Sequence, residues 1–194
     1  MNQSFNLRKM VFISLFTALI AIGGYISFPI PFSPIPIVLS DFFLMLAGLC
    51  LGASGGAASM GLFLFLGAIG IPVFTGGKAG LAVFIGPTGG FLLGYLIGVY
   101  VLGLVSEKNK PSFLKDLIGL IAANLVIFGF GVPWLKLLLK LTWGKALTLG
   151  LMPFVIGNIV KTIAALALIQ VIRPFLLQIL GNSSQTRERL NEHF

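Results

Sequence analysis

One lysine lies inside an apolar stretch near the C-terminal end of the chain, PFVIGNIVKTIAALAL (153–168). A cation at the centre of a membrane-spanning helix costs about 2.5–3.5 kcal/mol by insertion scales, so such residues face the protein interior or a water-filled cavity. Asn158 precedes Lys161 by one helical turn, and the two therefore share a helix face. This pair is typical of a binding site for a small anion or carboxylate, with Lys161 as the charge partner and Asn158 as the hydrogen-bonding group. The alternative is a lysine near a helix end that extends its ammonium group to the membrane interface.

A second charge, Asp41, follows the apolar segment PIVLS (36–40). An acid here suits the N-cap or first turn of a helix, where it complements the helix dipole. The sharper alternative is that Asp41 pairs with Lys161 or contacts a ligand.

The sequence offers little for catalysis or metal binding. It has no Ser/His/Asp or Cys/His set and no acidic pair inside the apolar spans, so we expect no enzyme activity. The single histidine is His193 and the single cysteine is Cys50. A protein-built zinc site needs three or four ligands, so we expect no metal and no cofactor.

The composition predicts the class of protein that holds these residues. Of the 194 residues, 57% are hydrophobic and 9% are charged, whereas soluble domains carry about 25% charged residues. We therefore expect an all-α integral membrane protein with a single membrane domain over 1–194. Since a spanning helix needs about 20 apolar residues, we expect a bundle of six transmembrane helices. The spans are about 10–28, 38–53, 55–72, 87–105, 113–132 and 149–171, with a polar tail at 181–194.

Proline and glycine mark the connections. FPIPFSPIP (28–36) predicts an ordered extended connection or a short interfacial piece. LGASGG (51–56) predicts a tight turn between the second and third spans. GIPVFTGGKAGLAVFIGPTGG (70–90) is apolar for a loop, so we expect it to fold back over the membrane part and cover something. PWLKLLLKLTWGKAL (133–147) is typical of an amphipathic helix that lies in the interface.

The net charge of +8 indicates anionic lipid headgroups rather than nucleic acid, because the cations lie between and beyond the apolar runs. With six spans, both termini share one side of the membrane. That side holds more Lys and Arg than the other, which predicts cytoplasmic termini in the cell membrane. The richer side has Arg8, Lys9, Lys108, Lys110, Lys115, Arg173, Arg187 and Arg189, and the opposite side has Lys78, Lys136, Lys140 and Lys145.

Two further stretches are candidate contact sites. GPTGG (86–90) opens the fourth span, and backbone N–H groups at a helix start can bind an anion or a carbonyl group. In the first span, Ser14/Ala18 and Thr17/Ala21 are pairs of small residues that allow close helix approach, either inside the protein or against a partner. No G-x-x-x-x-G-K-[ST] motif occurs, so we expect no ATP hydrolysis by this chain.

Three stretches carry a resemblance to a known family. They are PFSPIPIVLSDFFLMLAGLCLGASGG (31–56), GPTGGFLLGY (86–95) with the segment before it, and ALTLGLMPFVIGNIVKTIAALAL (146–168). Together these stretches resemble the BioY family. They occur in that family's order and spacing and cover most of the chain from about Ser14 to Leu177. Members are biotin-binding S components of energy-coupling factor (ECF) transporters. The resemblance implies a six-helix bundle with an outward-facing pocket, a transmembrane coupling protein and two ATP-binding-cassette ATPases as partners.

The resemblance also implies site residues. The family's last-helix lysine falls on Lys161, and the acid of its D-x-x-K pattern falls on Asn158, so that acid is missing and Asn158 cannot neutralise Lys161. A carboxamide can still hydrogen-bond the carboxylate tail or the ureido ring of biotin. The Thr and Gln of the family's P-x-P-x-T-x-Q pattern fall on Val38 and Ser40.

The remaining implied positions are glycines, aromatic residues and a docking surface. The glycine pattern is matched, and aromatic side chains are expected to pack on the biotin rings. The family's alanine-xxx-alanine docking surface is absent, so Ser14/Ala18 or Thr17/Ala21 would replace it. The matched glycine-rich positions are Gly76, Gly77, Gly86, Thr88, Gly89 and Gly90, and the aromatic candidates are Phe74, Phe84 and Tyr95.

Other functions stay open from the sequence. One is a self-sufficient facilitator or small-solute channel that needs no ATPase. Another is a structural or assembly membrane protein without a ligand. Within the transporter class, a biotin precursor or another carboxylate vitamin is the alternative ligand.

Overall fold

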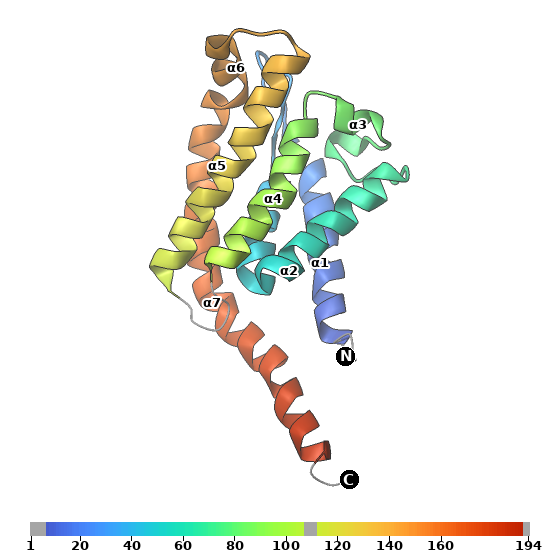
Figure 1. Cartoon of the computed structure of the whole chain (residues 1–194), viewed down its shortest axis with the longest axis vertical. Coiled ribbons are helices and arrows are strands. Elements are labelled where there is room, and N and C mark those ends of the chain that lie inside the picture. The colour runs from blue at the N-terminus through green and yellow to red at the C-terminus, as the bar shows by residue number, and fades with distance from the viewer. Residues whose placement is uncertain (1–6, 107–111, 192–194) are drawn as a thin grey trace.

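The computed structural model describes residues 7–106 and 112–191, with side chains described as far as residue 175 in the last helix. Lys108 and Lys110, two of the charges used to predict orientation, lie outside the described residues, as do the side chains of Arg187 and Arg189. The described part is nearly all helical (Figure 1). Its elements are α1 (Leu7–Tyr25), β1 (Ser27–Phe28), β2 (Ile37–Val38), α2 (Ser40–Ala68), the 3-10 helix η1 (Thr75–Gly77), α3 (Ala82–Ile85), α4 (Gly89–Val105), α5 (Phe113–Leu138), α6 (Trp143–Gly150) and α7 (Met152–Asn191).

The predicted spans correspond to helices of the bundle. In the described part, α1, α2, α5 and the stretch Trp143–Phe175 are long and apolar enough to cross a membrane. The shorter α4 has 17 residues, which at 1.5 Å per residue is about 26 Å and close to the hydrocarbon thickness of a bilayer. Because α2 divides into two segments, the predicted six-helix bundle is α1, the two halves of α2, α4, α5 and α7.

The division of α2 lies at Gly52, inside the predicted turn. Its φ of 72° and ψ of −174° belong to a region that is almost exclusive to glycine. Figure 1 shows α2 turning sharply there, and a Cβ at Gly56 would lie 3.1 Å from the Cα of Gly48 in the other half. The turn is therefore one non-helical residue between two closely packed helical segments.

The helices pack through small residues and a shared apolar core. A Cβ at Gly94 of α4 would lie 2.9 Å from the backbone oxygen of Ile127 of α5, so the two helices meet backbone to backbone. The core below the loops joins four helices, because its most buried side chains come from α2, α4, α5 and α7. They are Leu49, Leu102, Leu120 and Ile169, each at most 1% exposed.

The connections at the loop end confirm one prediction and correct another. The proline-rich segment 28–36 is not extended throughout: it joins the paired strands β1 and β2, with Ser27 opposite Val38, and turns between them, where the backbone N–H of Ser33 donates to the carbonyl oxygen of Ile30 at 3.1 Å. The 70–90 loop folds back onto the bundle, and its Phe74 is only 2% exposed. The Phe74 ring packs edge-on against Phe63 of α2, with centroids 5.4 Å apart.

The prediction of one continuous helix over 133–147 is wrong. Instead, α5 continues through Pro133 to Leu138, and Lys140 adopts a φ of 51° that ends the helical path. A new helix, α6, begins after Thr142, whose side chain accepts a hydrogen bond from the backbone N–H of Lys145 at 3.5 Å. The apolar spacing looked continuous because α5 and α6 each place apolar residues toward the protein, but a left-handed residue and a helix cap separate them.

Arg173 has other surroundings than the sequence suggested, and the small-residue pairs of α1 and the polar tail are now placed. Arg173 was counted among the loop charges, but it is 5% exposed and pairs with Asp116. Thr17 faces α2 and is 4% exposed, with its hydroxyl 3.0 Å from the carbonyl oxygen of Ser59. Ser14 and Ala18 are exposed on the other side of α1. The residues 181–191, predicted as a polar tail, continue α7.

Candidate functional site

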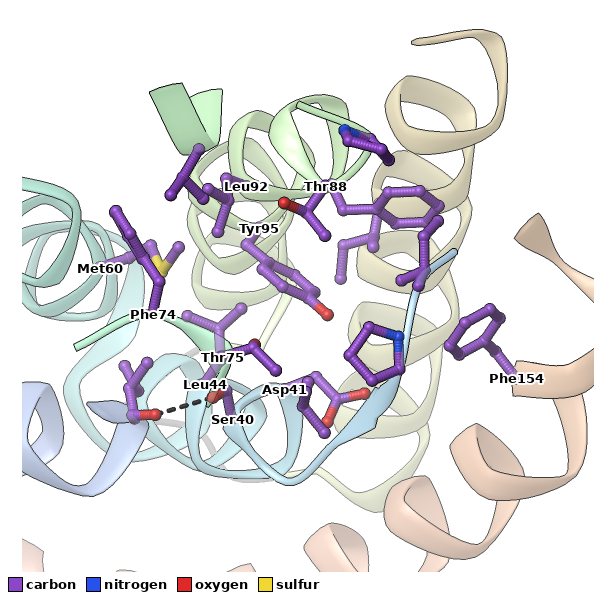
Figure 2. A pocket seen from close by; sticks show the side chains of 18 of the residues that line it. Ser40, Asp41, Leu44, Met60, Phe74, Thr75, Thr88, Leu92, Tyr95 and Phe154 are labelled. Atoms are coloured by element: carbon purple, nitrogen blue, oxygen red, sulfur yellow. Dashed lines mark hydrogen bonds between the residues drawn. The ribbon is translucent and has the colours of Figure 1, made fainter. Parts of the chain in front are cut away.

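A cavity of about 170 Å³ lies at the loop end of the bundle. Its wall is built by α2, α4, α5 and α7, together with Ile20 of α1, the segment that leads into β2, Val38 of β2 and the 70–88 loop. Figure 2 shows the side chains of Asp41, Tyr95, Thr88 and Phe74 gathered around it. The predicted cover formed by the two loops is thus part of the cavity wall.

The polar side of the cavity is organised by an ion pair. Lys161 of α7 donates to both carboxylate oxygens of Asp41, each at 2.8 Å, and to the carbonyl oxygen of Val38 at 2.7 Å. The two side chains are 11% and 8% exposed. Asp41 lies in the first turn of α2, so both readings of this residue are correct.

This arrangement changes the role expected for Lys161. Its ammonium group does not extend to the interface, and Lys161 is not among the residues that line the cavity, whereas Asp41 is. Asn158 cannot neutralise Lys161, but Asp41 supplies the carboxylate that position 158 lacks. Asp41 neutralises the ammonium group of Lys161 from α2, whereas an acid at position 158 would do so from α7.

Asn158 lines the cavity as part of an amide pair. Its Nδ2 donates to Oδ1 of Asn124 on α5 at 3.0 Å, and Nδ2 of Asn124 donates to the carbonyl oxygen of Leu120 at 2.9 Å. Both amides belong to the cavity wall. Since a carboxamide oxygen can accept two hydrogen bonds, the pair retains acceptor capacity toward a ligand.

Aromatic rings form much of the remaining wall. Phe91, Phe128 and Phe154 line one part, with Phe91 and Phe128 edge to face at 6.3 Å between centroids. Phe74 lines another, and Tyr95 points its hydroxyl into the cavity (Figure 2). Such walls suit a flat or ring-shaped apolar group.

The predicted glycines shape the chain around the cavity and are not part of its wall. Gly76 and Gly77 have φ angles of 71° and 74°, which turn the loop at η1. At Gly90 a Cβ would lie 2.2 Å from the Cβ of Trp134, and at Gly89 it would lie 1.8 Å from the carbonyl oxygen of Phe84. The backbone oxygen of Gly86 accepts a hydrogen bond from Trp134 Nε1 at 2.9 Å.

The other predicted positions either line the cavity or lie outside its wall. Thr88 lines the cavity just before α4. Phe84 packs on Phe74, with 5.6 Å between ring centroids, and does not line the cavity. The first-helix residues Ser14, Thr17, Ala18 and Ala21 also lie outside the wall.

Sequence reasoning missed several residues of the wall. Asn124 is an amide inside an apolar span, the same signal that identified Asn158, and it was overlooked. Lys78 was counted as a loop charge but lines the cavity. Phe91, Phe128 and Phe154 carry no local signal, because apolar aromatic residues occur throughout these helices.

The fold and cavity define the class: a multi-pass membrane protein that binds a small solute with an apolar ring part and polar groups. A model of the BioY family matches residues 1–178. Two similar proteins are the biotin transporter BioY of Thermotoga maritima, 38% identical over 82% of this chain and 92% of that protein, and the probable biotin transporter BioY of Pyrococcus horikoshii, 39% identical over 81% and 91%.

The fold agrees with a solved relative. The crystal structure of the S-component for biotin from an ECF-type ABC transporter superposes with a TM-score of 0.81 at 29% identity, covering 90% of this chain and 95% of that one. The chain belongs to the BioY family.

Proposed function

We propose that this protein is the substrate-binding S component of an ECF transporter and that it captures biotin in the cavity at the loop end of the bundle. The observation that carries the proposal is the combination, in a BioY family member, of aromatic walls with the Asn124–Asn158 amide pair. Biotin has a bicyclic ring with a neutral ureido group and a carboxylate tail. The cavity offers apolar surface for the ring and neutral hydrogen-bonding groups for the ureido.

The ureido group has N–H donors and a carbonyl acceptor. Its donors require acceptors, which the carboxylate of Asp41 and the amide oxygen of Asn158 provide on the cavity wall. Its carbonyl requires a donor, which the hydroxyl of Tyr95 provides. Because a buried polar group left without a partner costs about 1–3 kcal/mol, this set discriminates against solutes that lack a matching group.

Transport in this proposal depends on partner proteins. A transmembrane coupling protein and two ATP-binding-cassette ATPases supply the energy, since the chain has no nucleotide-binding motif. The protein lies in the cell membrane with both termini cytoplasmic and the cavity near the outer face. The coupling protein docks at the exposed small-residue pair Ser14/Ala18 of α1, beside Val11 and Leu15, which are 58% and 49% exposed.

The proposal is tested by measuring the equilibrium binding of biotin to the purified protein in detergent with calorimetry. We expect saturable binding at one site per chain, with competition by biotin analogues that keep the ureido ring. Absence of saturable biotin binding by folded protein would refute the proposal. Stronger binding of a biotin precursor or another carboxylate vitamin would identify that compound, in place of biotin, as the ligand.

A second experiment addresses the partners. Proteoliposomes that contain this chain alone are compared with ones that also contain a coupling protein and ATPases of a related transporter. We expect biotin accumulation only with the partners and ATP. Sustained uptake by the chain alone would identify a self-sufficient facilitator.

A further inference from the structure

The charges on the cavity wall do not balance. Of the described residues that line it, Asp41 and Lys78 are the two with charged side chains. Asp41 is neutralised by Lys161 at 2.8 Å. Lys78, in contrast, makes no side-chain hydrogen bond or ion pair with any described residue. The site as a whole therefore carries one uncompensated positive charge, which suits a monovalent anion.

Lys161 is already occupied. An ammonium group has three N–H donors, and three protein oxygens lie within 2.8 Å of this one, two from Asp41 and one from Val38. A ligand carboxylate that used Lys161 would have to displace Asp41 and leave a carboxylate that is 8% exposed without its partner. Breaking such a pair is strongly unfavourable.

The loop backbone brings Lys78 to the wall. Gly76 and Gly77 both have positive φ, and this turn allows the backbone N–H of Phe74 to donate to the carbonyl oxygen of Lys78 at 3.0 Å. Phe74 is anchored in the core at 2% exposure. The turn therefore holds the backbone of Lys78 next to a buried residue, while the Lys78 side chain is exposed to solvent and accessible to a ligand.

We propose that Lys78, and not Lys161, binds the carboxylate of the transported ligand. This inference rests on the proposed function. The tail of the ligand then lies against the 70–88 loop, and the ureido ring is left to the Asn124–Asn158 pair and Asp41. Lys161 becomes a positioning residue that orients the carboxylate of Asp41.

The test compares two ligands that differ only in charge, biotin and biotinamide, by calorimetry on the purified protein. We expect the wild type to bind biotin about twofold to fivefold more tightly than biotinamide, a range that reflects partial solvent screening of an exposed ion pair. In Lys78→Gln this preference disappears, because biotin binding weakens while biotinamide binding does not. Lys78→Arg retains the preference, and raising the ionic strength reduces it in the wild type.

Controls separate the inference from the proposed function. Lys145→Gln, on the exposed part of α6, should keep the full preference for biotin, and Lys161→Gln should weaken both ligands alike. If Lys78→Gln keeps the preference, or weakens both ligands equally, or if Lys161→Gln abolishes the preference, Lys78 is not the carboxylate partner, although the protein still binds biotin. If the wild type binds neither ligand, the proposed function fails and this inference fails with it.

Discussion

Lys161 of α7 and Asp41 of α2 form an ion pair in which both Nζ–oxygen distances are 2.8 Å. The same ammonium group binds the backbone of Val38 in β2 at 2.7 Å. One side chain of α7 thereby fixes the end of the β1–β2 hairpin and the first turn of α2. The resemblance to the family pattern implies an acid at position 158 of α7, and in this chain Asp41 of α2 provides the acid instead.

The exchange of acids predicts a rescue. Asp41→Asn leaves Lys161 charged and mostly buried, so we expect a loss of about 3 kcal/mol in stability and weaker biotin binding. The double variant Asp41→Asn/Asn158→Asp should recover most of both, because residue 158 shares a helix face with Lys161. Thermal unfolding in detergent and biotin calorimetry measure the two effects.

The single variant Asn158→Asp is the matched control for this rescue. It places two carboxylates near one ammonium group, so it should be less stable than the double variant because like charges repel. A double variant no better than Asp41→Asn alone would show that position 158 cannot take over as the counter-charge.

The amide pair predicts a specific loss of binding. Asn124→Ala removes the acceptor that holds Asn158 Nδ2 at 3.0 Å, so the amide of Asn158 is no longer fixed. We expect biotin binding to weaken by about 1–2 kcal/mol, the range for a lost hydrogen-bond partner. Thr148→Ala, at an exposed threonine of α6 that bonds to the Gly144 carbonyl, should have no effect. Unchanged affinity in Asn124→Ala would exclude the amide pair from the site.

Which site residues could be predicted from the sequence depends on whether the residue type is unusual in its local surroundings. Lys161 and Asn158 were identified because a cation or an amide inside an apolar run is unfavourable unless something compensates it. The partner of Lys161 could only be suspected, because Asp41 lies 120 positions away and helix packing decides whether the two meet. Asn124 gave the same signal as Asn158, so its place in the cavity was within reach of the sequence.

Other local sequence patterns are compatible with two different structures. The glycines at 89 and 90 fit a backbone ligand site equally well as a close helix contact, and the structure has the close contact, with Trp134 and Phe84 against them. The apolar spacing over 133–147 fits one helix, but the left-handed backbone of Lys140 interrupts it. Such choices depend on neighbours in space, which the order of residues does not contain.

A second buried charge cluster, far from the cavity wall, predicts a loss of stability without a loss of binding. Arg173 binds Asp116 with both arms, at 2.8 and 2.9 Å, and reaches the hydroxyl of Ser106 at 3.1 Å. The side chains of Arg173 and Asp116 are 6% and 1% exposed. We expect Arg173→Met to lower stability by about 3–5 kcal/mol, because it leaves a buried carboxylate unpaired.

The apolar double variant is the control for this cluster. Arg173→Met/Asp116→Leu removes both charges together and should restore much of the loss, since a buried ion pair is often replaceable by apolar residues. The melting temperature in detergent reports stability, and calorimetry at a temperature where each variant is folded should give unchanged biotin affinity. Weaker binding by folded Arg173→Met would mean that the cluster is coupled to the cavity.

The glycine contact between α4 and α5 predicts a difference between two otherwise equal substitutions. At Gly90 of α4 a new Cβ would lie 2.2 Å from the Cβ of Trp134, whereas at Gly129 of α5 nothing lies within 4 Å. We expect Gly90→Ala to destabilise the protein by about 1–3 kcal/mol through overpacking. Gly129→Ala should be neutral or stabilising by up to about 1 kcal/mol, because alanine is the better helix former.

Gly90→Ala should also weaken biotin binding, since displacing α4 moves Phe91 and Tyr95 in the cavity wall. Equal melting temperatures for the two variants would mean that α4 and α5 are not packed this closely.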